Sequence, residues 1–341
     1  MARALELAAL GAGNVAPNPL VGCVITARDQ IIGEGFHARF GEAHAEVNAI
    51  NSVKAREFLS ESTLYVTLEP CNHTGKTPPC TKLIAESGIR NVVVAVKDPH
   101  PLVSGSGIRF LETAGINVTC GLFEQEATFL NRRFFTFHRL GRPYIILRWA
   151  ESRDGYCDPV RKDDQRVSLP VSGSISRQKS HQWRTEEQAI LVGAQTVIHD
   201  NPSLLPRLWP GKPPLRILFD PHLRIPQDSK LFQDGNGCLV FNHIREDTSA
   251  GVEYRYVEPG GDLMEKMLKE MQRRMVLSVM VEGGPETISR FFEAGQWDEI
   301  RRFRSTLSIH EGVKAPAINL LPDITSASGN DYLDIFFRKS L

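Results

Sequence analysis

The architecture of this chain can be inferred from the segment Pro70-Cys71-Asn72-His73-Thr74-Gly75-Lys76-Thr77-Pro78-Pro79-Cys80. It contains two cysteines, and Glu46 of the triplet His44-Ala45-Glu46 lies 24 positions before Pro70. One histidine and two cysteines offer three ligands for a tetrahedral zinc ion and leave a fourth position for water, which is typical of catalytic rather than structural sites. The sequence therefore predicts a catalytic zinc centre built from His44, Cys71 and Cys80.

Glu46 is predicted to carry protons at this centre. A bound zinc ion lowers the pKa of water toward neutrality and makes hydroxide available. A carboxylate that is not a ligand could take a proton from that water and pass it to a leaving amine. A His-x-Glu followed by a Pro-Cys and a second Cys is the set used by zinc-dependent nucleobase deaminases. His73 is a rival ligand, but we expect it to be a pocket residue. The remaining cysteines are expected to be small buried or half-buried side chains: Cys23, Cys120, Cys157 and Cys238.

The length and the net charge of the chain limit the classes of protein to which it can belong. The chain has 341 residues, and 40 Lys and Arg residues balance 40 Asp and Glu residues. This length predicts about two domains, and the absent net charge argues against a protein that binds nucleic acid by neutralising phosphates. No run of apolar residues is long enough for a membrane span, and the first residues are typical of a helix rather than a signal peptide. Six scattered cysteines do not make a disulfide framework, so we expect a cytoplasmic protein with reduced thiols.

The first 140 residues alternate strand-like and helix-like patterns, which favours an α/β layered domain. The expected strands are Val21–Thr26, Ile31–Glu34, Thr63–Leu68, Asn91–Val96 and Asn117–Cys120, of which the first two form a hairpin. The expected helices begin at the N-terminus and near Ala43, and cover Thr81–Ser87 and Gly107–Ala114. Gly88 and Gly115 are expected to end the last two helices in the left-handed conformation.

A polar stretch that includes Gly141 and Pro143 predicts a domain boundary near residue 142. The strands expected after it are Tyr144–Trp149, Ala189–Val192, Leu215–Phe219, Cys238–Phe241, Ser278–Glu282 and Tyr332–Arg338. The helices expected there are Ser174–Arg184, Leu263–Arg274 and Pro285–Ala294. Residues 161–166 and 207–214 are expected to be loops.

The segment Glu69–Cys80 resembles the deaminase domain of the bifunctional deaminase–reductases of riboflavin biosynthesis. The resemblance extends to Pro17–Gly22, Gly41–Glu46 and Asp98–Gly107. It implies a cytidine-deaminase-like α/β/α domain over residues 1–142, which removes an amine hydrolytically from 2,5-diamino-6-ribosylamino-4(3H)-pyrimidinone 5′-phosphate. The substrate phosphate would need cations, for which Lys76, Lys97 and Arg109 are candidates. The family usually has Asn at the position of His100.

The second half resembles the reductase domain of the same family. The matching segments are Ser152–Gly155, Ala189–Val197, Asp200–Leu204, Arg216–Asp220 and Glu282–Pro285. The resemblance implies a dihydrofolate-reductase-like α/β domain over residues 143–341 that uses NADPH to reduce the ribosyl chain to a ribityl chain. It implies that the cofactor contacts Ala150, Pro170, Thr196, Asp200, Pro221, Gly284, Pro285, Glu286, Thr287, Ile288, Ser289 and Arg290. It implies that the substrate contacts Ser168, Arg184, Leu204, Arg207 and Glu282.

The residues of the second half indicate less by themselves. No Gly-x-Gly-x-x-Gly opens a helix, so a Rossmann dinucleotide site is not supported. Gly283-Gly284 lies between a predicted strand and a predicted helix, where glycines let a ligand approach backbone N–H groups. Taken alone, Arg184 is typical of a solvated helix charge and Asp200 of a turn residue. The guanidinium groups of Arg184 and Arg207 would nonetheless suit a phosphate.

Three alternatives stay open. A zinc deaminase acting on nucleic-acid bases is opposed by the absent net charge and by the long Cys71–Cys80 spacing. A deaminase with a degenerate reductase domain is favoured by Pro170 and Pro221, where the family commonly has an aromatic and a small polar residue respectively. A binding or structural protein is opposed by the open ligand position and by Glu46. We expect small phosphorylated pyrimidines as partners, with no nucleic acid and no membrane, and the sequence leaves a homo-oligomer open.

Overall fold

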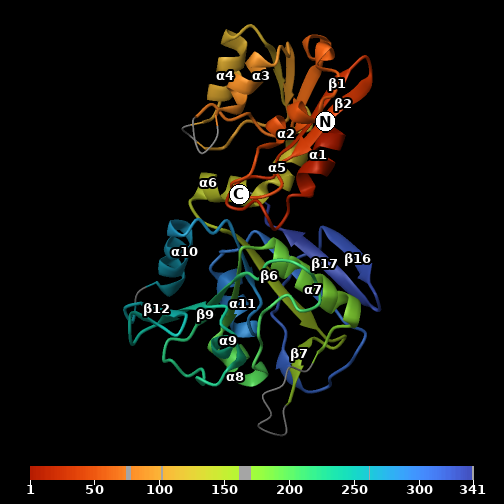
Figure 1. The fold of residues 1–341 in the computed structure, drawn as a ribbon. Helices are drawn as coiled ribbons and strands as arrows, with labels where there is room; N and C mark the ends of the chain where they lie inside the picture. Colours follow the sequence, from red (N-terminus) through yellow and green to blue (C-terminus); the bar gives the residue numbers. More distant parts are fainter. Residues whose placement is uncertain (74–77, 101–102, 161–169, 261, 340–341) are drawn as a thin grey trace. The chain divides into compact units, whose positions relative to one another are not determined.

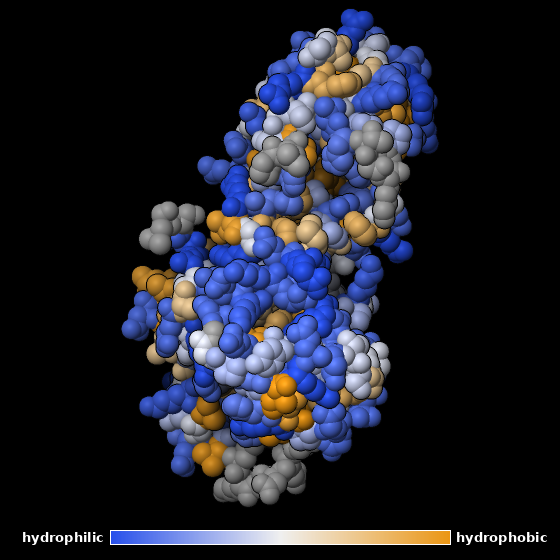
Figure 2. All heavy atoms as spheres, turned by 90° about the vertical axis from the view of Figure 1, so that its left-hand side faces the viewer, coloured by the Kyte–Doolittle hydropathy of each residue, from blue (hydrophilic) through white to orange (hydrophobic). Residues whose placement is uncertain are grey.

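The computed structural model describes residues 1–73, 78–100, 103–160, 170–260 and 262–339 (Figure 1). The chain divides into two compact units, Met1–Arg142 and Pro143–Leu341. Among the described helices, none combines the length and the hydropathy that crossing a membrane requires. Figure 2 shows one face of each unit, on which hydrophilic residues predominate and apolar residues gather in small groups.

A five-stranded sheet forms the centre of the described part of the first unit, in the order β2-β1-β3-β4-β5. Its strands are β1 (Gly22–Ala27), β2 (Gln30–Phe36), β3 (Thr63–Val66), β4 (Asn91–Val94) and β5 (Asn117–Cys120). β1 and β2 form an antiparallel hairpin, and β3, β4 and β5 run parallel. Arg28 and Asp29 turn the hairpin with positive φ angles of 51° and 60°, which is the geometry of a tight two-residue turn.

Helices cover both faces of this sheet. They are α1 (Ala2–Ala9), α2 (Ala45–Ser52), the 3₁₀ helix η1 (Arg56–Glu61), α3 (Cys80–Glu86), α4 (Ser106–Thr113), α5 (Glu124–Leu130) and α6 (Arg132–Leu140). Because side chains alternate along a strand, Cys23 and Ile25 of β1 pack with α2, α3 and α4, and Val24 packs with α1 on the other face. The first unit is therefore an α/β/α layer structure.

A ten-stranded sheet dominates the described part of the second unit, in the order β11-β12-β10-β9-β8-β13-β6-β14-β17-β16. The strands are β6 (Tyr144–Glu151), β7 (Tyr156–Pro159), β8 (Ala189–Gly193), β9 (Leu215–Phe219), β10 (Cys238–Asn242), β11 (Asp247–Ser249), β12 (Val252–Tyr256), β13 (Ser278–Val281), β14 (Glu299–Arg304), β15 (Gly312–Lys314), β16 (Ile324–Ser328) and β17 (Asp331–Phe337). The strands from β12 to β14 in this order are parallel, and β11, β17 and β16 join antiparallel. β7 and β15 pair separately.

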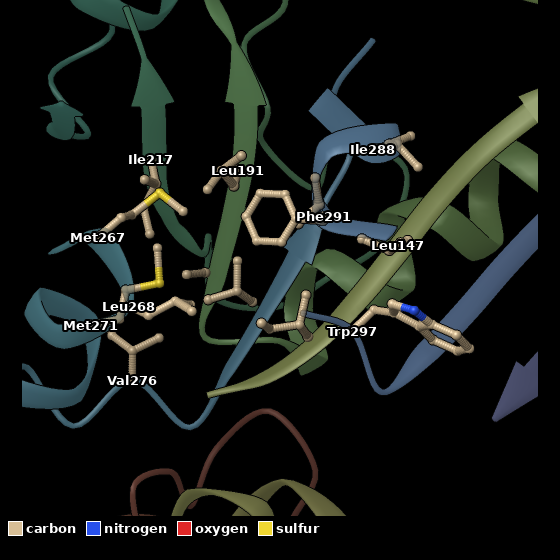
Figure 3. Close-up of a cluster of buried hydrophobic side chains, with 14 of the residues drawn as sticks. Leu147, Leu191, Ile217, Met267, Leu268, Met271, Val276, Ile288, Phe291 and Trp297 are labelled. Atoms are coloured by element: carbon tan, nitrogen blue, oxygen red, sulfur yellow. The ribbon is translucent and has the colours of Figure 1, made fainter. Parts of the chain in front are cut away.

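Both faces of the central strands are buried under helices, which explains their continuous apolar runs. The helices are α7 (Ser174–Glu186), α8 (Ala194–Asp200), α9 (Lys230–Gln233), α10 (Leu263–Arg273) and α11 (Pro285–Glu293). Along β8, Leu191 packs with α10 and α11, whereas Ile190 and Val192 pack with α8 and α9. Figure 3 shows the first of these clusters, in which Met267 and Met271 of α10 and Phe291 of α11 point toward the strands.

The predicted fold class, two successive α/β domains, is confirmed. Each strand predicted from the sequence is present, and Gly88 and Gly115 end α3 and α4 with φ angles of 84° and 81°. The sequence patterns missed α5, α6, α8 and α9 and the strands β7, β11, β12, β14, β15 and β16. The expectation that Cys120 is buried or half-buried is wrong, because Cys120 lies exposed at the end of the edge strand β5. Cys23 and Cys238 are buried and Cys157 is half-buried, as predicted.

Candidate active sites

His44, Cys71 and Cys80 come together in the first unit. His44 caps the N-terminus of α2, Cys71 follows β3, and Cys80 opens α3. The His44 Nδ1 atom lies 3.6 Å from the Cys71 Sγ atom and 3.3 Å from the Cys80 Sγ atom, and the three ligand atoms all lie within 4.8 Å of one another. The Cys80 N–H group also points at the Cys71 Sγ atom at 3.4 Å.

These distances fit a tetrahedral zinc ion. Zn–S bonds of about 2.3 Å and Zn–N bonds of about 2.05 Å at tetrahedral angles place sulfur and nitrogen about 3.6 Å apart. The separations of 3.6 and 3.3 Å are close to this value. Hydrogen bonds with the Cys80 thiol and with His44 hold the pKa of the Cys71 thiol well below its usual range, and the thiolate is the form that binds metal. One histidine nitrogen and two cysteine sulfurs also form a donor set that favours zinc over magnesium or calcium.

Glu46 lies beside the three ligands in the first turn of α2. Its side chain is buried, with 3 % of the residue exposed, and it hydrogen-bonds with the Cys80 thiol. Burial raises the pKa of the Glu46 carboxyl to about 7, and the neighbouring Cys71 thiolate adds to the rise. A bound dication would favour the charged form again. A carboxyl group in this position can hold a proton and release it near neutral pH.

The position of α2 fixes both His44 and Glu46. Glycines of β2 allow the helix to lie close to the sheet, since a Cβ atom on Gly35 would be 2.3 Å from the Ala49 nitrogen. Asn48 donates a side-chain hydrogen bond of 2.8 Å to the Phe36 carbonyl of the same strand. The helix that carries the metal ligand and the acid is therefore tied to the hairpin by close packing and by a hydrogen bond.

Glu69 is a site residue that the sequence patterns missed. It is 4 % exposed and precedes the Pro70-Cys71 pair. Its two carboxylate oxygens accept hydrogen bonds from the N–H groups of Asp98 (3.2 Å), Gly105 (2.9 Å), Gly107 (2.9 Å) and Ile108 (3.3 Å). Glu69 thereby ties the segment that carries Cys71 to the loop that follows β4.

The other candidates of the first unit lie outside the metal triad. His73 is exposed and is not part of the group of ligand atoms. Lys97 and Arg109 are exposed, and Lys76 falls outside the described residues. His100 contacts His138 of α6, with ring centroids 5.1 Å apart. A role for Lys76, Lys97 and Arg109 in holding a phosphate stays a prediction, as does the expectation that His73 is a pocket residue.

The second unit contains a cavity of about 790 Å³ at the carboxyl ends of β6, β8 and β13. Ligands of open parallel sheets bind at this edge. Most of the residues that the family resemblance singled out line it: Ala150, Pro170, Arg184, Thr196, Asp200, Leu204, Arg207, Glu282, Gly284 and Pro285. Ser168 falls outside the described residues.

Arg184 and Glu282 form an ion pair in the wall of this cavity. The Arg184 Nε atom donates to Glu282 at 3.2 Å, and one of its terminal nitrogens forms a second, short hydrogen bond with the same carboxylate. The two side chains are only 12 % and 5 % exposed, so the interpretation of Arg184 as a solvated helix charge is wrong. Asp200 is the last residue of α8, and Asn201 after it has a positive φ of 44°.

Two strand–helix junctions meet at the cavity edge. A Cβ atom on Gly193 would lie 2.6 Å from the Thr287 side chain and one on Gly283 would lie 2.8 Å from it, so a larger residue at either position would displace Thr287. The Thr196 hydroxyl accepts a hydrogen bond of 2.9 Å from the Gly284 N–H group. The Gly283-Gly284 pair therefore joins β13 to α11 as predicted, with its backbone exposed to the cavity.

A second cavity, of about 340 Å³, lies beside these junctions. Four of the residues that the resemblance assigns to the cofactor line it: Pro221, Glu286, Thr287 and Arg290. The side chain of Ile288 does not, because it is fully buried in the hydrophobic core between α11 and the sheet. A contact between Ile288 and a cofactor would therefore have to involve its backbone, and it stays a prediction. Ser289 is half-buried on α11.

His181 and Arg148 line the larger cavity and were missed by sequence reasoning. His181 of α7 is 8 % exposed, and its buried Nδ1 atom has no hydrogen-bond partner among the described residues. Burial and the charges of Arg184, Arg207 and Arg148 lower its pKa to about 4, so the imidazole is neutral at pH 7. No motif in the sequence distinguished His181 from an ordinary core histidine.

Two family models match the chain. Residues 1–96 match the cytidine and deoxycytidylate deaminase zinc-binding region, and residues 143–305 match the RibD C-terminal domain.

Curated relatives match most of the chain. The riboflavin biosynthesis protein RibD of Bacillus amyloliquefaciens is 41 % identical, over 93 % of this chain and 86 % of its own length. The protein of the same name from Aquifex aeolicus is 39 % identical, over 92 % and 88 %.

Solved structures of two proteins are similar to this chain over nearly its whole length. A diaminohydroxyphosphoribosylaminopyrimidine deaminase/5-amino-6-(5-phosphoribosylamino)uracil reductase from Thermotoga maritima superimposes with a TM-score of 0.88 at 36 % identity, covering 98 % of this chain and 96 % of that one. RibD of Acinetobacter baumannii gives a TM-score of 0.88 at 30 % identity, covering 99 % and 98 %.

Proposed function

Since this chain belongs to the RibD family and is a bifunctional deaminase and reductase of riboflavin biosynthesis, we propose how its two units divide the work. The first unit (1–142) removes an amine from 2,5-diamino-6-ribosylamino-4(3H)-pyrimidinone 5′-phosphate. The second unit (143–341) then uses NADPH to reduce the ribosyl chain of the product to a ribityl chain. The observation that carries this proposal is the convergence of His44, Cys71 and Cys80 beside the buried Glu46.

In the first unit, His44, Cys71 and Cys80 would hold a zinc ion. A bound zinc ion supplies a Lewis acid that makes water a nucleophile at neutral pH. Glu46 would take a proton from the attacking water and pass it to the departing amine, so that ammonia leaves as a neutral molecule. The Glu46 carboxyl lies against Cys80 and is shielded from solvent, which keeps the proton at the reacting atoms.

In the second unit, the larger cavity would hold the phosphorylated substrate beside the cofactor. NADPH supplies a hydride when bound, and the acceptor is C1′ of the ring-opened ribosyl chain. The ion pair with Glu282 orients Arg184 and compensates its charge, whereas the guanidinium of Arg207 suits the substrate phosphate. Positioning by such groups accounts for much of the rate in cofactor-dependent reductions.

The deaminase proposal is tested with Glu46→Gln, Cys80→Ser and the control Glu42→Gln, which alters an exposed carboxylate near the same helix. Glu46→Gln should keep zinc and lose ammonia release by about 10²–10⁴-fold. Cys80→Ser should lose zinc, and Glu42→Gln should change neither zinc content nor rate. Normal deamination by Glu46→Gln would show that another group moves the proton.

The same variant tests the division of labour. Given the already deaminated compound, Glu46→Gln should oxidise NADPH at the wild-type rate, because Glu46 lies in the other unit. Loss of both activities in this variant would contradict two separate sites. Absence of NADPH binding to the wild-type chain at millimolar cofactor would support the degenerate-reductase alternative.

A further inference from the structure

The segment that follows α8 forms a large part of the wall of the larger cavity. Residues 201–208 are all described, and they form neither a helix nor a strand. The residues of this segment that line the cavity are Asn201, Pro202, Ser203, Leu204, Arg207 and Leu208. The family resemblance assigns two of them, Leu204 and Arg207, to the substrate. The course of this segment therefore decides the shape of the proposed substrate site.

The backbone of the segment adopts conformations that side chains disfavour. Asn201 and Leu204 have positive φ angles of 44° and 60°. Asparagine tolerates this left-handed region, whereas leucine rarely adopts it. Such a backbone persists only where the surrounding structure holds it in place. The shape of the cavity wall therefore depends on contacts made to the segment from outside.

Arg216 of β9 makes one of these contacts from behind the wall. It is 1 % exposed and is not part of the described lining of either cavity. Its Nη1 atom donates a hydrogen bond of 3.1 Å to the Ser203 carbonyl. The same guanidinium donates to the Asp234 carboxylate at 2.6 and 2.9 Å and to the Gly237 carbonyl at 2.9 and 3.1 Å. Because these bonds employ all five N–H groups of the arginine, the guanidinium is fixed in one orientation.

Arg184 holds the same segment from the cavity side. Its Nη1 atom donates a hydrogen bond of 3.3 Å to the Leu205 carbonyl, two residues after Ser203. Two guanidinium groups from different elements, β9 and α7, thus bind backbone carbonyls on either side of Leu204. A displaced segment would move Leu204 and would also take a hydrogen-bond partner from Arg184.

The start of the segment has a separate anchor. The side-chain oxygen of Asn201 accepts a hydrogen bond of 2.8 Å from the Lys230 N–H group at the start of α9. This bond does not involve Arg216. Loss of the bond between Arg216 and Ser203 should therefore affect the later part of the segment, which the resemblance assigns to the substrate, more than Asp200, which it assigns to the cofactor.

We propose that Arg216 is a positioning residue of the reductase site. By binding the Ser203 carbonyl, it holds residues 203–207 in the course that presents Arg207 to the phosphate of the substrate. The inference rests on the proposed reductase function, in which a guanidinium binds this phosphate. The family resemblance gave Arg216 no role, and the residue lies behind the cavity wall rather than in it.

The test uses the full-length, zinc-loaded chain and variants of one buried ion pair. Arg216→Lys and Arg216→Gln lack the planar fork that serves Ser203, Asp234 and Gly237 together. Asp234→Asn is the matched control, since it removes the charge of the partner and leaves Arg216 with its bond to Ser203. Dissociation constants of ribose 5-phosphate and of NADPH are measured by calorimetry. Oxidation of NADPH with the deaminated compound gives KM and kcat, and the Tm of the second unit shows that each variant folds.

Both Arg216 variants should bind ribose 5-phosphate about ten-fold more weakly and raise KM by a similar factor. Their affinity for NADPH should stay within about two-fold of wild type, because the Asn201 anchor is intact. Asp234→Asn should lower the Tm as well, but it should leave the affinity for both ligands within about two-fold.

Two results would overturn the role of Arg216 and leave the reductase proposal intact. One is wild-type affinity for ribose 5-phosphate in the Arg216 variants. The other is an equal loss of affinity in Asp234→Asn, or for NADPH in the Arg216 variants, which a general loss of stability would produce. Failure of the wild type to oxidise NADPH with the deaminated compound would overturn the reductase proposal and, with it, this inference.

Discussion

Glu69 offers the sharpest test of how the zinc site is held. Its carboxylate accepts four backbone N–H groups, two on each oxygen, from the loop after β4 and from the start of α4. The start of α4 packs tightly against the segment before Cys71, since a Cβ atom on Gly107 would lie 2.1 Å from the Pro70 carbonyl oxygen. The substitution Glu69→Gln keeps the size of the side chain and replaces one acceptor oxygen with a donor.

The expected loss follows from this count of hydrogen bonds. In Glu69→Gln, the oxygen of the introduced amide can serve one pair of N–H groups, and its NH₂ group then faces the other pair donor to donor. Leaving a buried donor unpaired costs about 1–3 kcal/mol, so two of them cost about 2–6 kcal/mol. For a unit of this size, a decrease of about 2–6 kcal/mol in the free energy of unfolding corresponds to a fall in Tm of about 6–18 °C. A loss of this size is a substantial fraction of the stability of a typical domain, which is about 5–15 kcal/mol.

Zinc release on heating, followed with a chromogenic chelator, measures unfolding of the first unit because all three ligands lie there. The control is Glu86→Gln, which alters an exposed carboxylate 3.7 Å from Lys82 on α3, where a surface ion pair contributes little. Glu69→Gln should release zinc at the lower temperature, and Glu86→Gln should follow the wild type. If Glu69→Gln holds zinc to the wild-type temperature and deaminates at the wild-type rate, the loop does not depend on this carboxylate.

Three other predictions address packing, charge and metal. Gly35→Ala should destabilise the first unit by about 1–3 kcal/mol, because the new Cβ meets the Ala49 nitrogen at 2.3 Å; an unchanged temperature of zinc release would contradict it. Hydrogen bonds from Arg273 and Arg274 lower the pKa of Glu270 to about 2 in the folded protein. The ionised Glu270 therefore contributes its full stabilising free energy at a pH above its pKa in the unfolded chain. This contribution is lost as the pH falls toward the pKa of Glu270 in the folded protein. Glu270→Gln should therefore cost about 1–2 kcal/mol at pH 7 after solvent screening, and by pH 3 the gap to wild type in urea unfolding should shrink by more than half; a constant gap would exclude this ion pair as its source. Removal of zinc with a chelator should lower the Tm of the first unit and leave the transition of the second unit in place, so a joint shift of both transitions would refute independent metal stabilisation.

The zinc ligands could be predicted because their chemistry is local. His44, Cys71 and Cys80 are of residue types that few other roles demand together, and each stands at the start of a helix or just after a strand. Glu69 could not be predicted as a site residue, because its four partners follow 29 to 39 positions later and offer only backbone groups. A carboxylate that binds backbone N–H groups leaves no pattern of side chains in the sequence.

The strand β14 shows a second limit of prediction from the sequence. Its sequence, Glu299-Ile300-Arg301-Arg302-Phe303-Arg304, has too many charges to be typical of a central strand. In the structure Arg301 is buried, with its Nε atom 2.6 Å from Glu299 and its guanidinium 4.5 Å from the Trp183 ring centroid. Paired charges of this kind can occupy an interior, and which charges will pair is settled only by the fold.

The net charge of the whole chain differs from the local charge of the larger cavity. The chain has no net charge, yet the described lining of the larger cavity carries five cationic side chains against three carboxylates. One of these carboxylates, Glu282, is already bound to Arg184 and faces Arg148 at 3.9 Å. Burying two guanidinium groups against one carboxylate is costly unless an anion completes the set. The two excess positive charges of this lining would complement the phosphate ester of the substrate that we propose for the second unit.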